Sequence, residues 1–202
     1  MQNNGISRAN ILGGLAKIIA EKTADGVINH TGAKPHITLG ALPSNNVDEK
    51  IGQKAASQVL SAIAKSLKLS GISVGVTSDI EQALWRKYIF VAAWGALAAA
   101  RKLTLGEIRS QSHIQFLLER LVHEYANIAV KLGVDIKDKH ISETLTFLTR
   151  LPATSETSMQ RDIAAGRESE FDVLVAYPKM QADKLSVSAP VLTQCYDKLM
   201  SE

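Results

Sequence analysis

The chain has 202 residues, 46% of them hydrophobic, and a formal net charge of +3 at pH 7. This length allows one large or two small domains, and the small charge, without a tract of Lys and Arg, gives no electrostatic case for a nucleic-acid partner. No apolar run approaches the roughly 20 residues that span a bilayer, and the N-terminus lacks the apolar core of a signal peptide. The single cysteine, Cys195, excludes an intrachain disulfide. We therefore expect a cytoplasmic protein without a membrane partner.

Residues 1–78 are predicted to form short strands and one helix. Gly26 and Gly32 bracket the first short β-type run. The strand pattern covers residues 27–30, 36–42 and 72–76. Between the last two of these runs, residues 47–67 carry apolar side chains at helical spacing.

From Ser78 onward the pattern changes to helix, and we place a domain boundary there. Ser78 and Glu81 form a capping box at the start of one helix, and Thr104 with Glu107 forms a second one. Further helices are predicted over residues 112–132, 139–151, 171–184 and 190–200. The third of these contains Pro178, which predicts a kink or an early break.

A stretch with hydroxyl and carboxylate groups lies before that proline-containing helix. A helical run that carries Ser158 ends at Gly166, a residue suited to a helix C-terminus. Ser169 then opens the next helix, with Asp172 as its capping-box acid. Glu170 therefore falls at the start of that helix.

Together these residues resemble the C-terminal signature of the ketopantoate reductases (2-dehydropantoate 2-reductases). In that family a Ser-Met pair precedes an Asp, and Glu-Ile-Asp follows a short turn. Here Ser158 begins the run S-M-Q-R-D, and Glu170 begins the run E-F-D. The upstream run L-W-R-K, which ends at Lys87, resembles the lysine-bearing helix of the family. The two matches and their spacing are specific together, whereas either one alone is weak.

The resemblance implies an α+β fold that is mainly α. An all-α C-terminal domain of the 6-phosphogluconate dehydrogenase C-terminal-like type, for substrate binding and dimerisation, is expected at residues 79–202. A small partial Rossmann-like sheet with one helix, the remnant of an NADP-binding domain, is expected at residues 1–78. The sequence has no G-x-G-x-x-G turn, and such a turn supplies the amides that hold a pyrophosphate at a helix N-terminus. We therefore expect this polypeptide alone to bind NADPH weakly and to be inactive.

Four residues of the helical part occupy the positions of the catalytic and substrate-binding groups of the family. Lys87 matches the catalytic lysine, which donates a proton; alternatively, it is a helix-edge lysine whose stem covers apolar surface. Ser158 matches the residue that binds the substrate carboxylate; alternatively, its hydroxyl satisfies an amide at a helix start. Val91 and Gly95 lie one and two turns after Lys87 on the same helix face, where the family usually has substrate-binding asparagines.

The departure at these two positions bears on the substrate. Neither Val91 nor Gly95 offers a side-chain hydrogen-bond donor. A site that lacks such a bond loses on the order of 1–3 kcal/mol for each one. This departure argues against ketopantoate as the substrate and favours a bulkier or more apolar 2-oxo acid.

Two further residues match cofactor-binding groups of the family. Glu170 matches a glutamate that contacts the cofactor; alternatively, it is an acid in a first helical turn, which the helix macrodipole favours. Asn4, in the run Q-N-N-G, matches an asparagine that binds cofactor and substrate; alternatively, this segment is a disordered tail. The five histidines show no metal-ligand spacing, so no metal site is expected.

The predicted function is therefore the reduction of a 2-oxo acid to a 2-hydroxy acid with NADPH, like that of a 2-dehydropantoate 2-reductase. If the substrate is ketopantoate, the reaction belongs to pantothenate biosynthesis. The expected partner is a small 2-oxo acid, and the expected assembly is a homodimer. Two alternatives remain open: a non-enzymatic helical module for dimerisation or interaction, and a regulatory remnant that binds a small acid without a cofactor.

Overall fold

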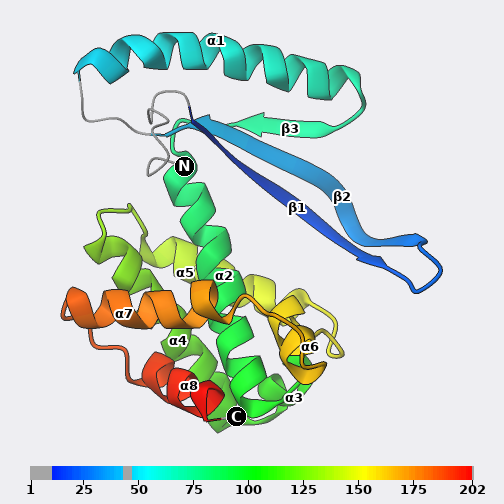
Figure 1. Cartoon of the computed structure of the whole chain (residues 1–202), viewed down its shortest axis with the longest axis vertical. Helices are drawn as coiled ribbons and strands as arrows, with labels where there is room; N and C mark the ends of the chain where they lie inside the picture. Colours follow the sequence, from blue (N-terminus) through cyan, green and yellow to red (C-terminus); the bar gives the residue numbers. More distant parts are fainter. Residues whose placement is uncertain (1–10, 43–46, 202) are drawn as a thin grey trace. The chain divides into compact units, whose positions relative to one another are not determined.

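The computed structural model describes residues 11–42 and 47–201, and the chain divides into two compact units, Met1–Leu84 and Trp85–Glu202. Each unit has a different architecture (Figure 1). The division lies inside a long helix, whereas the boundary predicted from the sequence, near Ser78, lies just before that helix begins.

The first unit is a three-stranded sheet with one helix. Strand β1 (Leu12–Lys22) pairs antiparallel with β2 (Ile28–Ala41), and β2 pairs parallel with β3 (Ser73–Val76). Helix α1 (Val47–Leu69) connects the two parallel strands and packs against β3 (Figure 1), because parallel strands need a crossover connection. The small sheet with one helix that the sequence predicts is confirmed.

The sequence predicts two short strands where the structure has the single strand β2. The register of β1 and β2 shifts between the pair Lys17–His36 and the pair Ile19–Thr31. A shift of this kind interrupts the alternation of side chains between the two faces of a sheet. The apolar pattern of β2 is therefore split into two runs at this place.

A pair of glycines on neighbouring strands makes room for the first residue of the next helix. Gly13 and Gly40 are cross-strand partners, and a Cβ on either one would lie 2.6 Å from a side-chain atom of Ile80. Ile80 is fully buried. Within the first unit, the sheet therefore holds the start of that helix by close packing against backbone.

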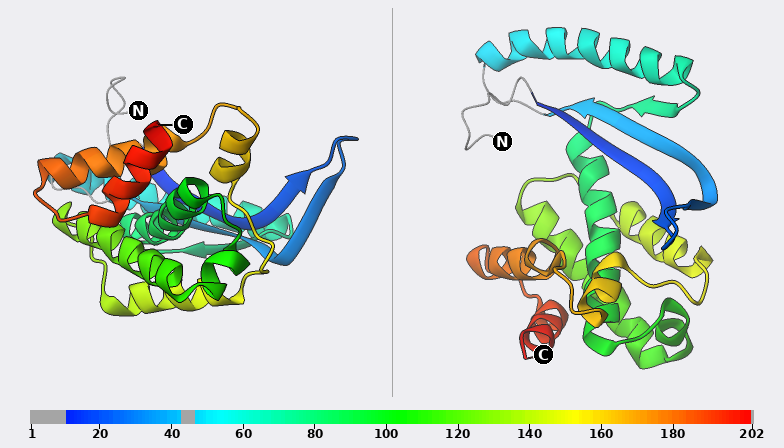
Figure 2. Two further views of the ribbon diagram at one scale, coloured as in Figure 1. Left: turned by 90° about the horizontal axis from the view of Figure 1, so that it is seen from below. Right: turned by 45° about the vertical axis from the view of Figure 1, so that its right-hand side comes forward.

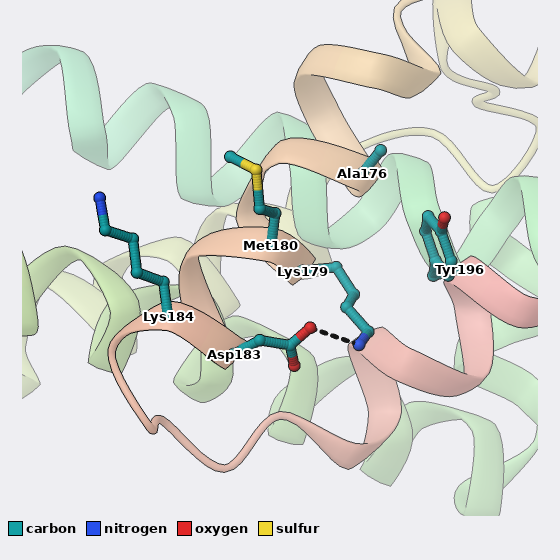
Figure 3. A pocket seen from close by; sticks show the side chains of 6 residues that line it. All are labelled: Ala176, Lys179, Met180, Asp183, Lys184 and Tyr196. Carbon is teal, nitrogen blue, oxygen red and sulfur yellow. Dashed lines mark hydrogen bonds and ion pairs between the residues drawn. The ribbon is translucent and has the colours of Figure 1, made fainter.

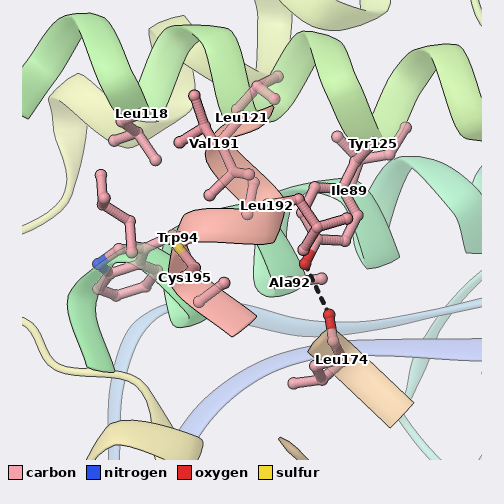
Figure 4. Close-up of a cluster of buried hydrophobic side chains, with 14 of the residues drawn as sticks. Ile89, Ala92, Trp94, Leu118, Leu121, Tyr125, Leu174, Val191, Leu192 and Cys195 are labelled. Carbon is pink, nitrogen blue, oxygen red and sulfur yellow. Dashed lines mark hydrogen bonds between the residues drawn. The ribbon is translucent and has the colours of Figure 1, made fainter. Parts of the chain in front are cut away.

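The second unit is helical, and α2 runs through its middle (Figures 1 and 2). The helical elements are α2 (Ile80–Arg101), α3 (Leu105–Ser110), α4 (Ser112–Lys131), α5 (Asp138–Arg150), α6 (Ser158–Ala164), η3 (Asp172–Ala176), α7 (Tyr177–Lys184) and α8 (Pro190–Met200). Residues 92–100 of α2, mostly alanine, are all buried, because small side chains let neighbouring helices approach closely. Figure 4 shows side chains of α2, α4 and α8 meeting in this core.

Two of the predicted helix starts can be compared with the observed caps. Asp79 rather than Ser78 caps α2, since Oδ1 of Asp79 accepts the N–H of Gln82 at 2.9 Å. At α3 the predicted capping box is confirmed: Thr104 and Glu107 each bind the backbone N–H of the other. The predicted cap at Ser78 is therefore wrong by one residue, because Ser78 and Asp79 are both good N-cap residues.

A π-helical segment, η3, stands where the sequence predicts a kink at Pro178. The chain is helical from Phe171, and the N–H of Tyr177 donates to the carbonyl of Asp172, five residues back. Pro178 then lies in the first turn of α7, and it has no N–H to donate back into η3. The wide turn therefore accommodates the proline without ending the helix.

Candidate functional site

The predicted residues on α2 lie along one stripe of the helix. Lys87 is exposed, Val91 is half-buried and Gly95 is buried. Arg86, next to Lys87, pairs with Glu143 of α5, which ties this part of α2 to its neighbour. The stripe therefore leads from the surface of the second unit into its core.

Gly95 lies against the start of α6. A Cβ at this position would lie 3.4 Å from Cε of Met159 and 3.7 Å from Oγ1 of Thr157. These are ordinary van der Waals distances, so alanine would fit, but a longer side chain would displace one of these groups. The absence of a side chain at Gly95 thus lets Thr157, the residue before Ser158, pack against α2.

The hydroxyl that caps α6 belongs to Thr157. Its Oγ1 accepts the N–H of Gln160 at 3.2 Å, and its backbone is extended, as is typical of an N-cap residue. Ser158 is the first residue of the helix itself. The alternative interpretation of Ser158, a hydroxyl that satisfies a helix-start amide, is therefore wrong, because Thr157 has that role.

Ser158 contacts Glu170 instead. The Ser158 hydroxyl donates to Oε2 of Glu170 at 3.4 Å. The chain turns back between them at Gly166, whose φ of +63° lies in the region that favours glycine. Arg167 closes this turn, because Nε and Nη2 bind Oδ1 of Asp162 at 3.0 and 2.7 Å. Two predicted site residues are thus brought together.

Glu170 lies at the start of the next helix, as predicted, and its side chain is exposed. The capping differs from the prediction: Oγ of Ser169 accepts the N–H of Phe171 at 3.4 Å, rather than that of Asp172. The ring of Phe171 stacks on Tyr196 of α8, with centroids 5.8 Å apart. Phe171, which follows Glu170, is therefore held in place by aromatic packing, and this packing supports the backbone at Glu170.

Two tyrosine hydroxyls, which sequence reasoning missed, attach this helix to α2 and α4. Tyr88 donates to the carbonyl of Val173 at 2.5 Å, and Tyr125 to that of Leu174 at 2.7 Å. Figure 4 shows the second of these bonds. Burial raises the pKa of both phenols, so both remain donors at physiological pH. The one local signal was Pro178, because a proline inside a helix leaves a carbonyl without its usual donor.

A surface hollow of about 400 Å³ lies between α7 and α8 (Figure 3). It is lined by Ala176, Lys179, Met180, Asp183, Lys184 and Tyr196. Lys179 and Asp183 form an ion pair at 2.6 Å beside it. None of the lining residues is a predicted site residue, so the hollow does not define the candidate site.

Some predictions concern absences or residues that the structure does not describe. Asn4, the predicted cofactor- and substrate-binding asparagine, lies outside the described residues. In the described part of the chain, no three His, Cys, Asp or Glu side chains are grouped so that they could hold a metal ion. Within the same residues, no helix has the length and apolar character needed to cross a membrane.

Comparison with known families identifies the second unit. Residues 79–201 match the sequence model described as "Ketopantoate reductase PanE/ApbA C terminal". The chain belongs to the ketopantoate reductase family. The matched residues include every helix from α2 to α8, and the resemblance drawn from the signature residues is confirmed.

Curated relatives agree with this assignment. An uncharacterized oxidoreductase of Bacillus subtilis is 28% identical over 193 residues, which are 96% of this chain and 60% of that protein. The 2-dehydropantoate 2-reductase of Pyrobaculum aerophilum is 28% identical over 141 residues, 70% of this chain and 50% of that enzyme. The family is thus one of oxidoreductases, and this chain spans only part of the length of these relatives.

Solved structures share the fold. The 2-dehydropantoate 2-reductase of Geobacter metallireducens gives a TM-score of 0.80 at 20% identity, over 99% of this chain and 63% of that one. A D-mandelate dehydrogenase with NADH and anilino(oxo)acetate gives 0.78 at 17% identity, over 99% and 62%. The dimeric ketopantoate reductase of Staphylococcus aureus gives 0.77 at 18%, over 95% and 61%. The predicted fold class, α+β and mainly α, is confirmed.

Proposed function

We propose that this chain carries the substrate-binding and catalytic part of a nicotinamide-dependent reductase that converts a 2-oxo acid to a 2-hydroxy acid. The contact between Ser158 and Glu170 carries the proposal, because two residues matched separately to substrate and cofactor groups lie within hydrogen-bond distance. A substrate carboxylate at Ser158 and a cofactor at Glu170 would be neighbours. Such proximity is what a transfer between the two molecules requires.

Lys87 would donate the proton to the alkoxide oxygen that forms when the carbonyl is reduced. A positioned general acid contributes on the order of 10²–10⁴-fold in rate. Lys87 directly precedes Tyr88, whose hydroxyl is bonded to the helix that Glu170 begins. This connection supports the assignment of Lys87 and Glu170 to one site.

Ser158 would bind the substrate carboxylate. Its single hydroxyl proton is directed at Glu170 over a long distance of 3.4 Å. A substrate carboxylate would accept a shorter, charge-assisted bond, and the substrate would therefore replace Glu170 as the acceptor. Glu170 would then be free of Ser158 when it contacts the cofactor.

NADPH is the cofactor that we expect, and it would supply the hydride when bound. Glu170 fits a role in holding it, because its carboxylate is exposed at a helix start and can accept hydrogen bonds from hydroxyl or amide groups. Two solved structures of D-mandelate dehydrogenase with this fold contain NADH, so both cofactors belong in the test. The 202-residue polypeptide alone should bind either one weakly, since its sequence has no glycine-rich phosphate-binding turn.

We favour a 2-oxo acid with an apolar substituent over ketopantoate. Val91 is half-buried and Gly95 is buried against Met159, so neither position offers a polar group to the substrate. A hydroxyl of the substrate that is buried there without a partner would cost on the order of 1–3 kcal/mol. Anilino(oxo)acetate, present in one structural neighbour, is a suitable first aromatic candidate.

We also propose that the chain forms a homodimer. Val173, Tyr177 and Met180 follow one another at spacings of four and three residues, with exposed fractions of 60%, 46% and 52%. An apolar stripe of this kind is typical of an interaction surface. Met180→Lys should weaken association seen by light scattering, whereas Met200→Lys, at an exposed methionine of α8, should not.

The exposed apolar stripe of Val173, Tyr177 and Met180 also favours the non-enzymatic interaction module as the second candidate function.

The two candidate functions are separated by a turnover assay. The chain would be fused to the phosphate-binding half of a family member, with folding verified by circular dichroism. Loss of NADPH or NADH absorbance would then be followed with ketopantoate and with apolar 2-oxo acids. We expect turnover that is faster with the apolar acids. A folded fusion that turns over none of them would contradict the enzymatic proposal and favour the interaction module.

A further inference from the structure

The helix that contains η3 has two carbonyls without their usual backbone donors. In an α-helix the carbonyl of Val173 would accept from residue 177, and that of Leu174 from residue 178. The N–H of Tyr177 donates to Asp172 instead, and Pro178 has no N–H. In a π-helix the donor to Val173 would be residue 178, which is again the proline.

Two tyrosine hydroxyls take the place of these donors. Tyr88 of α2 donates to Val173, and Tyr125 of α4 donates to Leu174. Tyr125 is fully buried and Leu174 is 5% exposed, so the second bond is shielded from water. The two rings also contact each other edge to face, with centroids 6.2 Å apart.

The two accepting residues belong to the turn that carries Glu170. The N–H groups of Val173 and Leu174 both donate to the carbonyl of Glu170, at 3.1 and 2.8 Å. We propose that Tyr88 and Tyr125 are positioning residues, which hold this turn against α2 and α4 and so set where the Glu170 carboxylate lies relative to α2. The inference rests on the proposed function only for the role it gives to Glu170.

Tyr88 connects the turn of Glu170 to the segment of α2 that carries the proposed proton donor. Tyr88 follows Lys87 on α2, and its hydroxyl reaches the turn of Glu170 across 85 residues of chain. One short segment of α2 thus carries the proposed proton donor and an attachment for the proposed cofactor contact. Loss of the hydroxyl would leave Lys87 in place and let the turn of Glu170 move.

The test is residue-resolved amide hydrogen exchange of the full chain, measured by NMR. Tyr125→Phe and Tyr88→Phe remove only the hydroxyls and keep the rings. The control is Tyr196→Phe, which also removes only a hydroxyl and keeps the ring that stacks on Phe171. An unsatisfied carbonyl should speed exchange of the N–H groups of Val173 and Leu174 by roughly tenfold or more for Tyr125→Phe, and by less for the more exposed Tyr88 bond.

A rescue distinguishes positioning from general stabilisation. Pro178→Ala restores a backbone N–H at the position from which Leu174 would receive its helical donor. In the Pro178→Ala background, Tyr125→Phe should therefore speed exchange at Leu174 by only about threefold or less. A tyrosine that merely packs would give the same increase in both backgrounds.

The readouts give separate answers about the inference and about the reductase. Faster exchange at Val173 and Leu174, unchanged exchange across α5, and rescue by Pro178→Ala support the positioning role. Unchanged exchange at both residues, an equal increase across α5, or failure of the rescue would overturn it. No substrate or cofactor is used, so the result holds even if the fusion assay finds no turnover. If turnover is found, Tyr88→Phe should raise the KM for NADPH, with no further effect in a Glu170→Gln background.

Discussion

The Ser158 hydroxyl lies 3.4 Å from Oε2 of Glu170, while the hydroxyl of Thr157, one residue earlier, caps helix α6. The two neighbouring hydroxyls thus have different partners, so their roles can be tested separately by mutation. One is bonded within its own helix, and the other reaches a carboxylate at the start of the next helix. This difference yields the first prediction.

Thr157→Ala and Ser158→Ala should affect different properties, the first stability and the second substrate binding. Thr157→Ala removes an N-cap and should lower the free energy of unfolding by about 1 kcal/mol. Ser158→Ala removes no cap and should change it by less than about 0.5 kcal/mol, while it raises the KM for the 2-oxo acid in the fusion enzyme. Urea unfolding and steady-state kinetics on both variants provide the comparison. A Ser158→Ala variant with lowered stability and an unchanged KM would assign Ser158 to structure alone.

Glu124 should stabilise the N-terminus of α8 through its side chain. It is 5% exposed, and its carboxylate oxygens accept the N–H groups of Val191 and Leu192 at 3.0 and 2.8 Å. Glu124→Gln replaces one accepting oxygen with an NH₂ group that faces a backbone N–H. The substitution should therefore lower the free energy of unfolding by on the order of 1–3 kcal/mol. Glu119→Gln on the same helix should cost less than about 0.5 kcal/mol, as measured by urea unfolding. Equal effects of the two substitutions would contradict this role.

The stability that Glu124 contributes should also depend on pH. Burial raises the pKa of Glu124 above its ordinary value of 4.5, against the opposing effect of the two backbone N–H groups. A raised carboxyl pKa means that the folded state binds the proton more tightly. The stability gained from this tighter proton binding is complete below pH 4.5 and is lost as the pH rises through the pKa of Glu124 in the folded state. The difference in stability between the wild type and Glu124→Gln should therefore shrink as the pH rises above 4.5; a difference that grows would contradict the raised pKa.

Cys195 should be inert in the folded protein. Burial raises the pKa of its thiol from 9.0 to about 12, and the thiolate is the reactive form. The difference of about three units lowers the thiolate fraction by roughly a thousandfold at mildly alkaline pH. Since Cys195 is the one cysteine in the chain, a thiol reagent reports on it alone. Labelling should be slow in buffer and fast in denaturant; fast labelling of the folded chain would show that α8 opens locally.

The sequence allowed prediction of the features that depend on local chemistry. The capping box of Thr104 and Glu107 and the glycine that follows α6 were predictable because each depends on a few neighbouring residues. Thr157 and Ser158 could not be told apart, because either hydroxyl satisfies the rule for an N-cap. At α2 the same ambiguity moved the start by one residue.

Features that depend on distant contacts were not predictable. The Tyr88 and Tyr125 hydroxyls find their acceptors across 85 and 49 residues of chain, and no local pattern specifies such a partner. Pro178 indicated that the helix is perturbed, but not that a π-helical turn would absorb the proline. The contact between Ser158 and Glu170 was not predicted, since neither their separate family matches nor their spacing shows that the chain folds back at Gly166.

The most direct measurement is the turnover number of the fusion enzyme with Lys87→Ala, compared with Lys131→Ala, at an exposed lysine of α4. Each variant would be tested with its best 2-oxo acid and saturating cofactor, after urea unfolding has shown that the fold is intact. We expect Lys87→Ala to lower kcat by on the order of 10²–10⁴-fold with little change in NADPH affinity, while Lys131→Ala leaves both unchanged. If Lys87→Ala keeps near-normal turnover, Lys87 is not the proton donor and the proposed reductase mechanism is contradicted.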